Sequence, residues 1–473
     1  MSYSPAFSAS KHHEELGPSF YDAVEPARFP QHILRYRNQR WAGRVGLDAL
    51  SDQEWIDHFG RFKPLPGSFE QPLALRYHGH QFRTYNPHLG DGRGFLFAQL
   101  KDAEDGRLLD LGTKGSGQTP WSRHADGRLT LKGGVREILA TEMLEALGVE
   151  TSKTFSLIET GEELERGDEP SPTRSSVLVR LSHSHIRIGT FQRFLYLNEV
   201  DNIRRLLDHT VRAYLPETWR DEEPARAAAF LEQVSRRVAR MGAQWMAAGF
   251  VHGVLNTDNI NVTGESFDYG PWRFLPHYDP GFTAAYFDET GLYAFGRQPD
   301  ALLWNLYRLA ECLLPLASQD LLEQALASFE PALHREFAHA ILRRLGLQSK
   351  GYEQDGALAK DLWTFLHETR APFEQTFFDW YGGVLSSERA QRSRSASFYV
   401  HESFQAFRTR LDGFLPSPDI NHEHPYFERP TPCTMLVDEV ETIWNPIAAE
   451  DDWSLFAAKL DSIRTMAEAY RVR

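Results

Sequence analysis

The sequence has little cysteine and no long apolar run. Its 473 residues contain two cysteines, Cys312 and Cys433, too few for a disulfide scaffold or a cysteine-based structural zinc site. No segment approaches the roughly 18 consecutive apolar residues that a membrane-spanning helix needs. Residues 1–20 lack an apolar core and are not rich in arginine, so they resemble neither a secretory signal nor a transit peptide. We therefore expect a cytoplasmic protein that does not bind membranes.

Basic charge is also scarce. Lys and Arg total 51 against 65 Asp and Glu, which gives a formal net charge of −14 at pH 7. Proteins that follow a nucleic-acid backbone need clustered Lys and Arg, whereas the basic residues here are scattered. We expect no nucleic-acid partner, and any anionic ligand should be small and held locally. A Walker A sequence is absent, which argues against a P-loop nucleotide fold.

Short β-like runs dominate residues 73–182. One helix interrupts them at 135–147, and the polar segment 161–175 is expected to be an exposed loop. The β-like runs, which glycines and Asp-Gly pairs separate, lie at 94–100, 108–114, 129–131, 154–159 and 176–181.

Helical periodicity dominates after Asn198, and the Ser- and Arg-rich segment 385–397 is expected to be a mobile loop. The expected helices are 206–214, 225–249, 301–316, 321–345 and 358–369. This order predicts an α+β protein with a protein-kinase-like two-lobed fold, in which a β-rich N-lobe with one embedded helix precedes a mostly helical C-lobe. The predicted units are an N-terminal wrap at 1–60, the N-lobe at 61–195, the C-lobe at 196–415 and a C-terminal extension at 416–473.

The segment 252–259, followed by Asp268, is the sharpest chemical signal. It comes directly after an amphipathic helix, and apolar residues flank it on both sides. Residues 260–267 are expected to form a tight hairpin that returns Asp268 to face Asp258 and Asn259. Phosphoryl-transfer sites need one carboxylate to deprotonate the attacking hydroxyl, and an Asn and an Asp to hold Mg²⁺. A surface turn rich in Asn and Asp is the alternative interpretation.

A second constellation lies in the β-rich region. Lys114 ends the run 108–114, and Glu137 lies on the flank of the apolar stripe of the interrupting helix. A strand lysine paired with a helix glutamate is the kinase device for holding nucleotide phosphates. An ordinary surface lysine and glutamate are the alternative, and only the downstream loop favours the pair.

Glycine-rich stretches and two arginines are further candidates for phosphate contacts. Arginine matches phosphate oxygens in a bidentate way, which points to Arg180 and Arg187. The two histidines between them lack a third metal ligand, so we expect a structural role for both. Backbone N–H groups for phosphate, or plain turns, are the two readings of the stretches 89–94, 115–117 and 126–128.

With these motifs the sequence resembles the selenoprotein O family, the kinase-like protein adenylyltransferases. The resemblance runs from about Tyr77 to about Leu314. Its motifs are residues 77–82, 89–93, 114–123, 126–128, 136–137, 184–191, 249–259, 268–271 and 298–299.

The resemblance implies that ATP binds in a flipped orientation, so that the α-phosphate faces the acceptor and AMP is transferred. In that arrangement Asp258 is the proton acceptor, and Lys114, steadied by Glu137, holds phosphate. Asn259 and Asp268 bind the metal ion, which is Mg²⁺, with Mn²⁺ as the alternative. The residues expected to bind the nucleotide are Gly90, Gly92, Arg93, Lys114, Asp126, Gly127, Arg180, Arg187 and Asp268.

The implied partners are proteins that bear Ser, Thr or Tyr hydroxyls, including the chain itself, and we expect a monomer. Some features depart from the family. Arg83 stands where Gly is usual, and Gly133-Gly134 replaces a pair of serines. The last ~100 residues match poorly, and the cysteine common near the family's C-terminus is missing, which puts redox control through such a thiol in doubt.

Two other functions use the same residues. One is an ordinary kinase that transfers the γ-phosphate, and the other is a catalytically inactive nucleotide-binding scaffold of the pseudokinase type. The intact set of phosphate- and metal-binding residues argues against the scaffold. Arg180 and Arg187 favour the adenylyltransferase over the kinase, because flipped ATP buries its γ-phosphate and buried charge needs paired cations.

Overall fold

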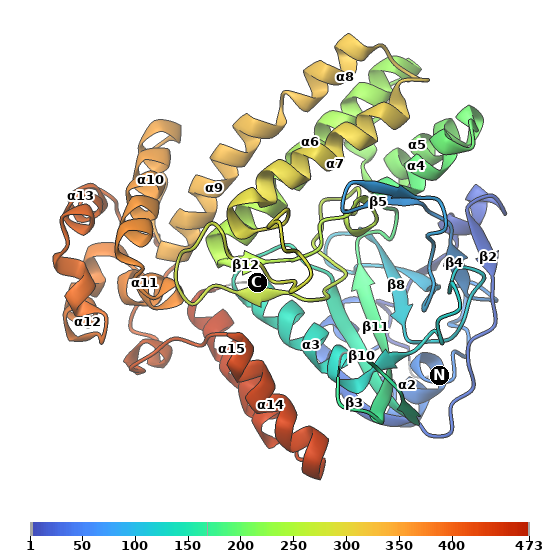
Figure 1. The fold of residues 1–473 in the computed structure, drawn as a ribbon, viewed down its shortest axis with the longest axis horizontal. Coiled ribbons are helices and arrows are strands. Elements are labelled where there is room, and N and C mark those ends of the chain that lie inside the picture. Colours follow the sequence, from blue (N-terminus) through green and yellow to red (C-terminus); the bar gives the residue numbers. More distant parts are fainter. Residues whose placement is uncertain (1–2, 168, 472–473) are drawn as a thin grey trace.

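A nine-stranded antiparallel sheet forms one side of the molecule (Figure 1). The computed structural model describes residues 3–167 and 169–471. The main path of the sheet runs β2-β4-β7-β8-β11-β10-β3, while β1 pairs with β7 and β9 with β11. The strands are β1 (Ala9–Ser10), β2 (Tyr21–Ala23), β3 (Ile33–Arg37), β4 (Leu73–Leu75), β7 (Leu96–Lys101), β8 (Leu108–Lys114), β9 (Leu129–Thr130), β10 (Lys153–Leu164) and β11 (Thr173–Ser182).

Two small two-stranded sheets accompany the large one. They pair β5 (Gly79–Gln81) with β6 (Thr84–Asn86), and β12 (Phe250–Val251) with β13 (Arg273–Phe274). Most helices follow the sheet in the chain, and Figure 1 shows them gathered beside it. This arrangement confirms the α+β class.

The helices before and beside the sheet are α1 (Gln39–Arg44), α2 (Asp52–Phe59), α3 (Leu131–Ala146), α4 (Ile188–Tyr196) and α5 (Val200–Tyr214). The later ones are α6 (Glu223–Ala248), α7 (Gln298–Leu313), α8 (Gln319–Leu326), α9 (Phe329–Leu345), α10 (Tyr352–Thr369), α11 (Phe373–Trp380), α12 (Ser387–Arg392), α13 (Glu402–Leu411), α14 (Val437–Glu450) and α15 (Ser454–Ala469). Within the described ranges, no helix has the length and apolar character needed to cross a membrane.

Helix α3 is the one embedded among the strands. Thr130 caps its start by accepting a hydrogen bond from the Gly133 backbone N–H at 3.1 Å. Its apolar face packs on β10 and β11, and a Cβ at Gly134 would lie 2.3 Å from Leu157 Cδ1. The departure from the family at this position therefore has a structural reason, since only glycine lets the helix approach β10 so closely.

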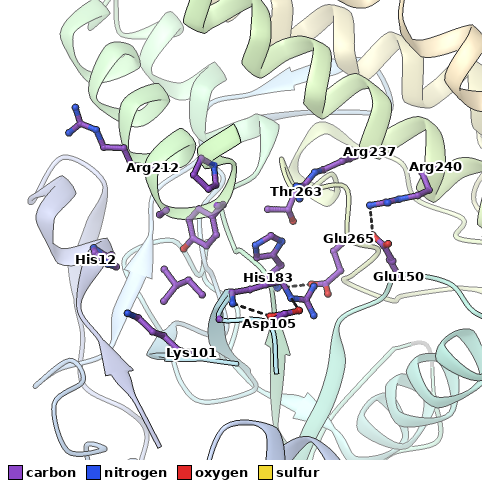
Figure 2. Close-up of a pocket in the computed structure, with 16 residues that line it drawn as sticks. His12, Lys101, Asp105, Glu150, His183, Arg212, Arg237, Arg240, Thr263 and Glu265 are labelled. Atoms are coloured by element: carbon purple, nitrogen blue, oxygen red, sulfur yellow. Dashed lines mark hydrogen bonds and ion pairs between the residues drawn. The ribbon is translucent and has the colours of Figure 1, made fainter. Parts of the chain in front are cut away.

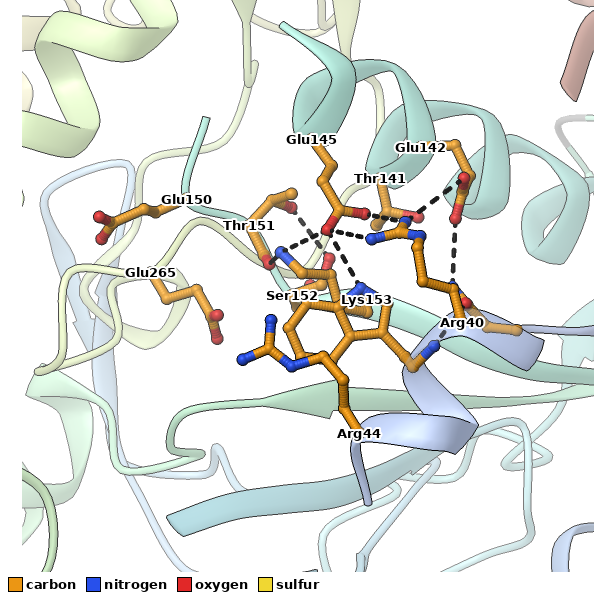
Figure 3. A network of polar contacts seen from close by, with 12 residues as sticks. Arg40, Arg44, Thr141, Glu142, Glu145, Glu150, Thr151, Ser152, Lys153 and Glu265 are labelled. Atoms are coloured by element: carbon orange, nitrogen blue, oxygen red, sulfur yellow. Dashed lines mark hydrogen bonds and ion pairs between the residues drawn. The ribbon is translucent and has the colours of Figure 1, made fainter. Parts of the chain in front are cut away.

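A polar network holds the C-terminal end of α3 (Figure 3). Arg40 of α1 contacts Glu145 of α3 at 2.6 Å, and Lys153 of β10 lies 3.7 Å from the same carboxylate. Helices from the C-terminal part of the chain also contact α3: α15 packs against it, and Glu441 of α14 pairs with Lys132 at 2.8 Å. Segments from both ends of the chain thus fix the helix that carries Glu137.

Helix α6 positions the segment 252–259, which was predicted to carry the catalytic residue. It ends at Gly249, whose φ of 62° is left-handed, and the chain turns there into β12. A Cβ at Gly249 would lie 2.7 Å from the Phe373 ring, so the position has no room for a side chain. The turn places residues 252–259 beside the sheet.

Some local predictions were wrong. The loop expected at 161–175 is shorter than predicted, because β10 continues to Leu164 and β11 begins at Thr173. Polar residues can occupy this sheet because they bond to one another: Thr160 Oγ1 donates to Ser175 Oγ at 2.8 Å. The expected mobile loop 385–397 contains α12 instead, where Ala390 is buried and the Arg389 guanidinium lies 4.5 Å from the Phe427 ring.

Two further predictions need correction. The expected helix 321–345 is two helices, α8 and α9. In the expected hairpin 260–267 the turn is present, since Gly264 N–H donates to Asn261 O at 3.0 Å, but its flanks do not pair with each other. They form bridges to Arg187 and Thr151 instead, which ties this loop to two other segments.

Candidate active site

Lys114 and Glu137 form the ion pair that the sequence predicted. Lys114 is the last residue of β8, and Glu137 lies on the face of α3 that covers the sheet. Their Nζ and Oε2 atoms are 2.7 Å apart, and both side chains are buried. A buried pair of this kind requires both partners, because either one alone would be an uncompensated charge.

Asp268 joins this pair to two arginines. Its Oδ1 lies 3.3 Å from Lys114 Nζ and 3.1 Å from an Arg180 nitrogen, and its Oδ2 lies 3.2 Å from Arg187. Burial alone would raise the pKa of Asp268, but Arg180, Lys114 and Arg187 hold it well below its usual range. We call Lys114, Arg180, Arg187 and Asp268 the cationic cluster, and it carries an ionised carboxylate surrounded by three cations.

Backbone geometry sets the cluster. Arg180 lies opposite Gly112 in the pairing of β11 with β8, so its side chain belongs to the sheet face near Lys114. Arg187 immediately precedes α4, and Asp268 has a left-handed φ of 65°. That φ is uncommon outside glycine, though Asp tolerates it better than most residues. Such outliers persist where the surroundings over-determine them, and here three cations do so.

Arg187 is the residue that links the cluster to the 252–259 segment. It donates to the backbone carbonyl of Asp258 at 2.8 Å and lies 3.4 Å from the Asp91 carboxylate. Its guanidinium carbon is 4.5 Å from the centre of the Tyr77 ring. The guanidinium is almost fully buried, so its contacts replace water on every side.

Asp258 lies in a short 3₁₀ turn, Thr257–Asn259. Its Oδ1 is buried and has no hydrogen-bond partner within the described part of the chain. Burial raises the pKa of Asp258 to about 6, although the nearby Arg187 opposes the shift. An unpaired buried carboxylate with a raised pKa is typical of a group that handles protons.

The neighbourhood of Asp258 is locked by hydrogen bonds. Thr257 Oγ1 accepts from the His80 backbone N–H at 2.7 Å, and Asn256 Oδ1 accepts from the Phe82 N–H at 3.0 Å. A Cβ at Gly79 would lie 3.0 Å from Asp258 Oδ1. Strand β5 therefore covers the carboxylate with backbone alone and leaves little room for a larger residue at that position.

Asn259 and Asp268, the predicted metal ligands, each offer side-chain oxygen atoms. Asn259 Nδ2 donates to the Val254 carbonyl at 3.0 Å, so the amide oxygen is the atom left to accept or ligate. Asp268 is ionised, and both groups offer the oxygen donors that Mg²⁺ prefers. In the described part of the chain there is no group of three or more His, Cys, Asp or Glu that could hold a metal. The residues fit an ion that takes its remaining ligands from phosphate and water.

The three glycine-rich stretches meet one another. Gly115 N–H donates to Arg93 O at 2.6 Å, and Gly117 N–H donates to Gly127 O at 3.1 Å. Trp121 packs against the first stretch so closely that a Cβ at Gly90 would lie 2.4 Å from its ring. A Cβ at Gly92 would likewise meet the Trp121 carbonyl at 2.8 Å. These glycines permit close backbone packing, a role that differs from both sequence interpretations, phosphate binding and plain turns.

Two charged residues that were predicted to bind the nucleotide lie outside the cationic cluster. Arg93 is exposed, although its charge contributes to lowering the pKa of Asp268. Asp126 is exposed and pairs with Arg166 at 2.8 Å. None of the contacts found in the described ranges joins Asp126 to the cationic cluster. The structure therefore brings Lys114, Arg180, Arg187 and Asp268 together and leaves Asp126 apart.

Sequence reasoning missed Asp91 and Tyr77 as neighbours of Arg187. Asp91 Oδ2 accepts from the Leu75 N–H at 3.1 Å, and burial raises its pKa although Arg187 acts in the opposite direction. Asp91 lies inside the glycine-rich stretch 89–94, so a signal was present. A buried acidic residue between two glycines is more informative there than the glycines themselves.

Comparisons with known proteins agree with one another. Residues 5–464 match the family model described as "Protein adenylyltransferase SelO". The protein nucleotidyltransferase YdiU of Synechocystis sp. is 42% identical over 471 residues, which covers 96% of each chain. Its namesake from Synechococcus elongatus is 43% identical over 485 residues, with 98% of this chain and 95% of the relative covered. That of Vibrio vulnificus is 41% identical over 387 residues, with 80% and 75% covered.

The family match extends on both sides of the region that carries the motifs. It continues to residue 464, so the poor match expected for the C-terminal part was wrong. The helices α14 and α15, which pack near α3, lie in this part.

Proposed function

Because the chain belongs to the SelO family of protein adenylyltransferases, we propose that its cationic cluster holds the phosphates of ATP while Asp258 accepts the proton of the attacking hydroxyl. The chain is a nucleotidyltransferase that transfers AMP from ATP to protein. The observation that carries the assignment of roles is the buried Asp258 carboxylate, which has no partner on Oδ1 within the described ranges and lies beside Arg187. No other carboxylate in the 252–259 segment competes for this role.

In this assignment AMP transfer is a single displacement at the α-phosphorus of ATP. The acceptor oxygen forms a bond to the α-phosphorus as the bond from that phosphorus to the bridging oxygen of diphosphate breaks. The hydroxyl proton passes to Asp258, and diphosphate leaves with the bonding electrons. A carboxylate with a pKa of about 6 is mostly ionised at pH 7, so it can accept the proton.

The phosphate oxygens carry the negative charge of the nucleotide and of the leaving group. Lys114, oriented by Glu137, and the two arginines supply fixed positive charge in a buried site, where such interactions are stronger than in water. When bound, Mg²⁺ or Mn²⁺ supplies further positive charge at the phosphates, and Asn259 Oδ1 and the Asp268 carboxylate would hold it. Asp268 would then exchange contacts with its cations for contacts with the ion.

Burial of Arg180 and Arg187 supports the flipped orientation of ATP. Both guanidinium groups are almost fully buried, so a phosphate that pairs with them is enclosed. A γ-phosphate destined for transfer must instead face the acceptor. We therefore propose that the γ-phosphate lies at the arginines and that the α-phosphate faces Asp258. The nucleotide-facing roles of Gly90, Gly92, Arg93, Asp126 and Gly127 remain predictions.

We also propose the kinase-like two-lobed arrangement. Its support is the origin of the residues: Lys114 and Glu137 come from the sheet and α3, whereas Asp258 and Asn259 follow α6 on the helical side (Figure 1). The division into units at 1–60, 61–195, 196–415 and 416–473 remains a prediction. So do Ser, Thr and Tyr as acceptors, the monomeric state, the cytoplasmic location and the absence of a nucleic-acid partner.

Incubation with ATP labelled separately at the α- and γ-phosphate tests the assignment. We expect protein-bound label from α-labelled ATP only, and none with Asp258→Asn, which keeps the shape of the side chain. Label from γ-labelled ATP only would replace this proposal by the ordinary kinase. Label from neither, with ATP still bound, would point to the scaffold.

A further inference from the structure

A second concave site, away from the cationic cluster, gathers basic side chains. It is a cavity of about 560 Å³ between the β7–β8 turn, α5 and α6, and none of the proposed catalytic residues lines it. We call it the basic pocket. The cationic or potentially cationic residues in its wall are His12, Lys101, Arg107, Arg212, Arg237 and Arg240.

Figure 2 shows how these side chains are arranged. His12, Lys101 and Arg212 lie along one side of the pocket, while Arg237 and Arg240 lie along the other. The two sets come from segments far apart in the sequence, so the pocket exists only in the folded chain. Its size falls within the range of about 300–1,000 Å³ that is typical of small-molecule sites.

The charge of the lining is opposite in sign to that of the whole chain. Lys101, Arg107, Arg212, Arg237 and Arg240 give five positive charges, and Asp105, Glu150 and Glu265 give three negative ones, so the lining carries +2. The full sequence carries −14. A basic lining on an acidic protein favours a small anion over a polyanion such as nucleic acid, which the rest of the surface would repel.

On one side of the pocket His12 pairs with Glu15 at 3.2 Å, whereas Lys101 and Arg212 lack acidic partners among the described residues. Neither Lys101 nor Arg212 forms an ion pair within the part of the chain that the structure describes, and the guanidinium carbon of Arg212 lies 4.4 Å from the centre of the Trp219 ring. On the opposite side, Arg240 pairs with Glu150 and Arg237 with Glu217. The unpaired Lys101 and Arg212 thus lie opposite two arginines that already have carboxylate partners.

Arg237 is a largely buried cation, and burial is the main influence on its charge. Burial lowers the pKa of its guanidinium, the nearby Glu217 raises it, and the adjacent Arg240 lowers it again. A lowered pKa means that the surroundings disfavour the positive charge in the absence of a further anion. An anion in the pocket would favour the charged form of Arg237.

The floor of the pocket is polar but carries little charge. His183 is buried, and burial lowers its pKa to about 3, so its ring is neutral at pH 7. Its backbone N–H donates to Glu265 at 2.7 Å. Leu108 and Tyr214 add an apolar wall. A ligand with anionic oxygens and one apolar side fits this combination.

We propose that the basic pocket binds a small phosphate-bearing metabolite, at a site separate from the one that holds ATP. Guanidinium groups recognise phosphate oxygens in a bidentate way, and four arginines line this cavity. The lining also includes Glu265, which lies between Asn259 and Asp268 in the chain, and His183, which lies between Arg180 and Arg187. The pocket therefore opens onto the backs of both segments that carry the proposed active site.

Calorimetric titration with inorganic pyrophosphate, without divalent ions, tests this proposal. The variant Lys101→Glu/Arg212→Glu reverses the two unpaired cations. Its matched control is Lys360→Glu/Arg394→Glu, which makes the same change in net charge at exposed residues that do not line the pocket. The affinity of each protein for Mg²⁺-ATP, measured separately, shows whether the fold and the ATP site remain intact.

We expect the wild type and the control to bind one more equivalent of pyrophosphate than the pocket variant, with Mg²⁺-ATP affinity equal in all three. The readout does not depend on AMP transfer, so it can fail while the proposed function holds. Equal pyrophosphate stoichiometry and affinity in all three proteins would overturn the proposal. An equal loss in both variants would also overturn it, because the effect would then be one of net charge.

Discussion

At the scale of single residues, Asp258 and Asp268 show how surroundings divide two carboxylates between two roles. Burial without a partner raises the pKa of Asp258 to about 6, whereas three cations hold that of Asp268 well below its usual range. Groups whose pKa values are pushed apart in this way are suited to different tasks. Asp258 suits proton transfer, and Asp268 suits permanent negative charge beside a metal ion.

The raised pKa of Asp258 gives a pH dependence. The ionised form accepts the proton, so the single-turnover rate of AMP transfer should fall as pH drops below about 6. At pH 5 about one tenth of the carboxylate is ionised, and the rate should be about tenfold below its plateau. A rate that stays level down to pH 5 at saturating ATP would show that Asp258 is not the titrating group.

The same shift predicts a stability effect. A folded-state pKa above the usual value contributes stability that is full below about pH 4 and is lost as pH rises through about 6. Ionised Asp258 should therefore destabilise the fold at pH 7, by up to about 3 kcal/mol. Asp258→Asn should raise Tm at pH 7, and its advantage should shrink at pH 4. A lower Tm at pH 7 would contradict the assignment of a strained, buried charge.

The Lys114–Glu137 pair predicts separable effects on stability and activity. Lys114→Met alone leaves Glu137 buried without its closest partner, which should cost about 3–5 kcal/mol in unfolding free energy. Adding Glu137→Gln removes the stranded charge, so stability should partly return while AMP transfer stays lost. Chemical denaturation and a transfer assay on both variants measure this. Recovery of activity in the double variant would mean that Lys114 does not act on the nucleotide.

At the scale of elements, α3 depends on contacts from outside the sheet. Arg40 holds Glu145, and burial of that carboxylate is outweighed by Lys153 and Arg40, which lower its pKa to about 2. Such a group stabilises the fold above about pH 4.5, and its contribution is lost as pH falls towards 2. The N-terminal helix α1 thus supports the helix that carries Glu137.

Arg40→Ala should lower the unfolding free energy at pH 7 by about 1–3 kcal/mol, because it removes a charged partner of a buried carboxylate. The loss should shrink near pH 3, where Glu145 is closer to protonation, and amide exchange should increase in α3. The exposed Arg392→Ala in α12, whose ion pair is 3.9 Å long, is the control and should change little. Unaltered amide exchange in α3 would show that Arg40 does not stabilise this helix.

At the scale of the whole molecule, a second hydrophobic core lies among the later helices, α9 to α13. Phe365 of α10 is fully buried there and contacts the rings of Tyr399 and Phe404. Phe365→Ala should cost about 3–5 kcal/mol by leaving a cavity. No member of the cationic cluster belongs to this core, so the affinity for Mg²⁺-ATP at 20 °C or below should not change. A parallel loss of ATP affinity would show that the two regions are energetically coupled.

The contacts among Lys114, Glu137 and Asp268 were the part of the candidate site that was most predictable from sequence. Lys114 pairs with Glu137 as the strand and helix patterns indicated, and Asp268 lies close to Lys114. These residues occur in short motifs whose spacing reflects local geometry. Tyr77 and Asp91, which enclose Arg187, could not be ranked in the same way, because their role depends on where distant strands place them.

The fold was predictable where hydrophobic periodicity was strong. Helices α3, α6 and α7 lie close to their predicted ranges. Polar segments misled the prediction, because pairing between side chains lets them enter a sheet, as Thr160 and Ser175 do. The N-terminal strands carry too few residues to show alternation, although β2 and β3 form the two ends of the sheet path.

That placement of β2 and β3 has a consequence for synthesis on the ribosome. Residues 33–37 of β3 pair with residues 156–159 of β10, so they remain without their partner until residue 159 has emerged. At about 5–20 residues per second, this wait lasts roughly 6–25 s. During it, the aromatic side chains of the N-terminal segment, including Trp41 and Trp55, lack the strands that later cover them. Nascent chains that have not reached β10 are therefore the species most in need of a holding chaperone.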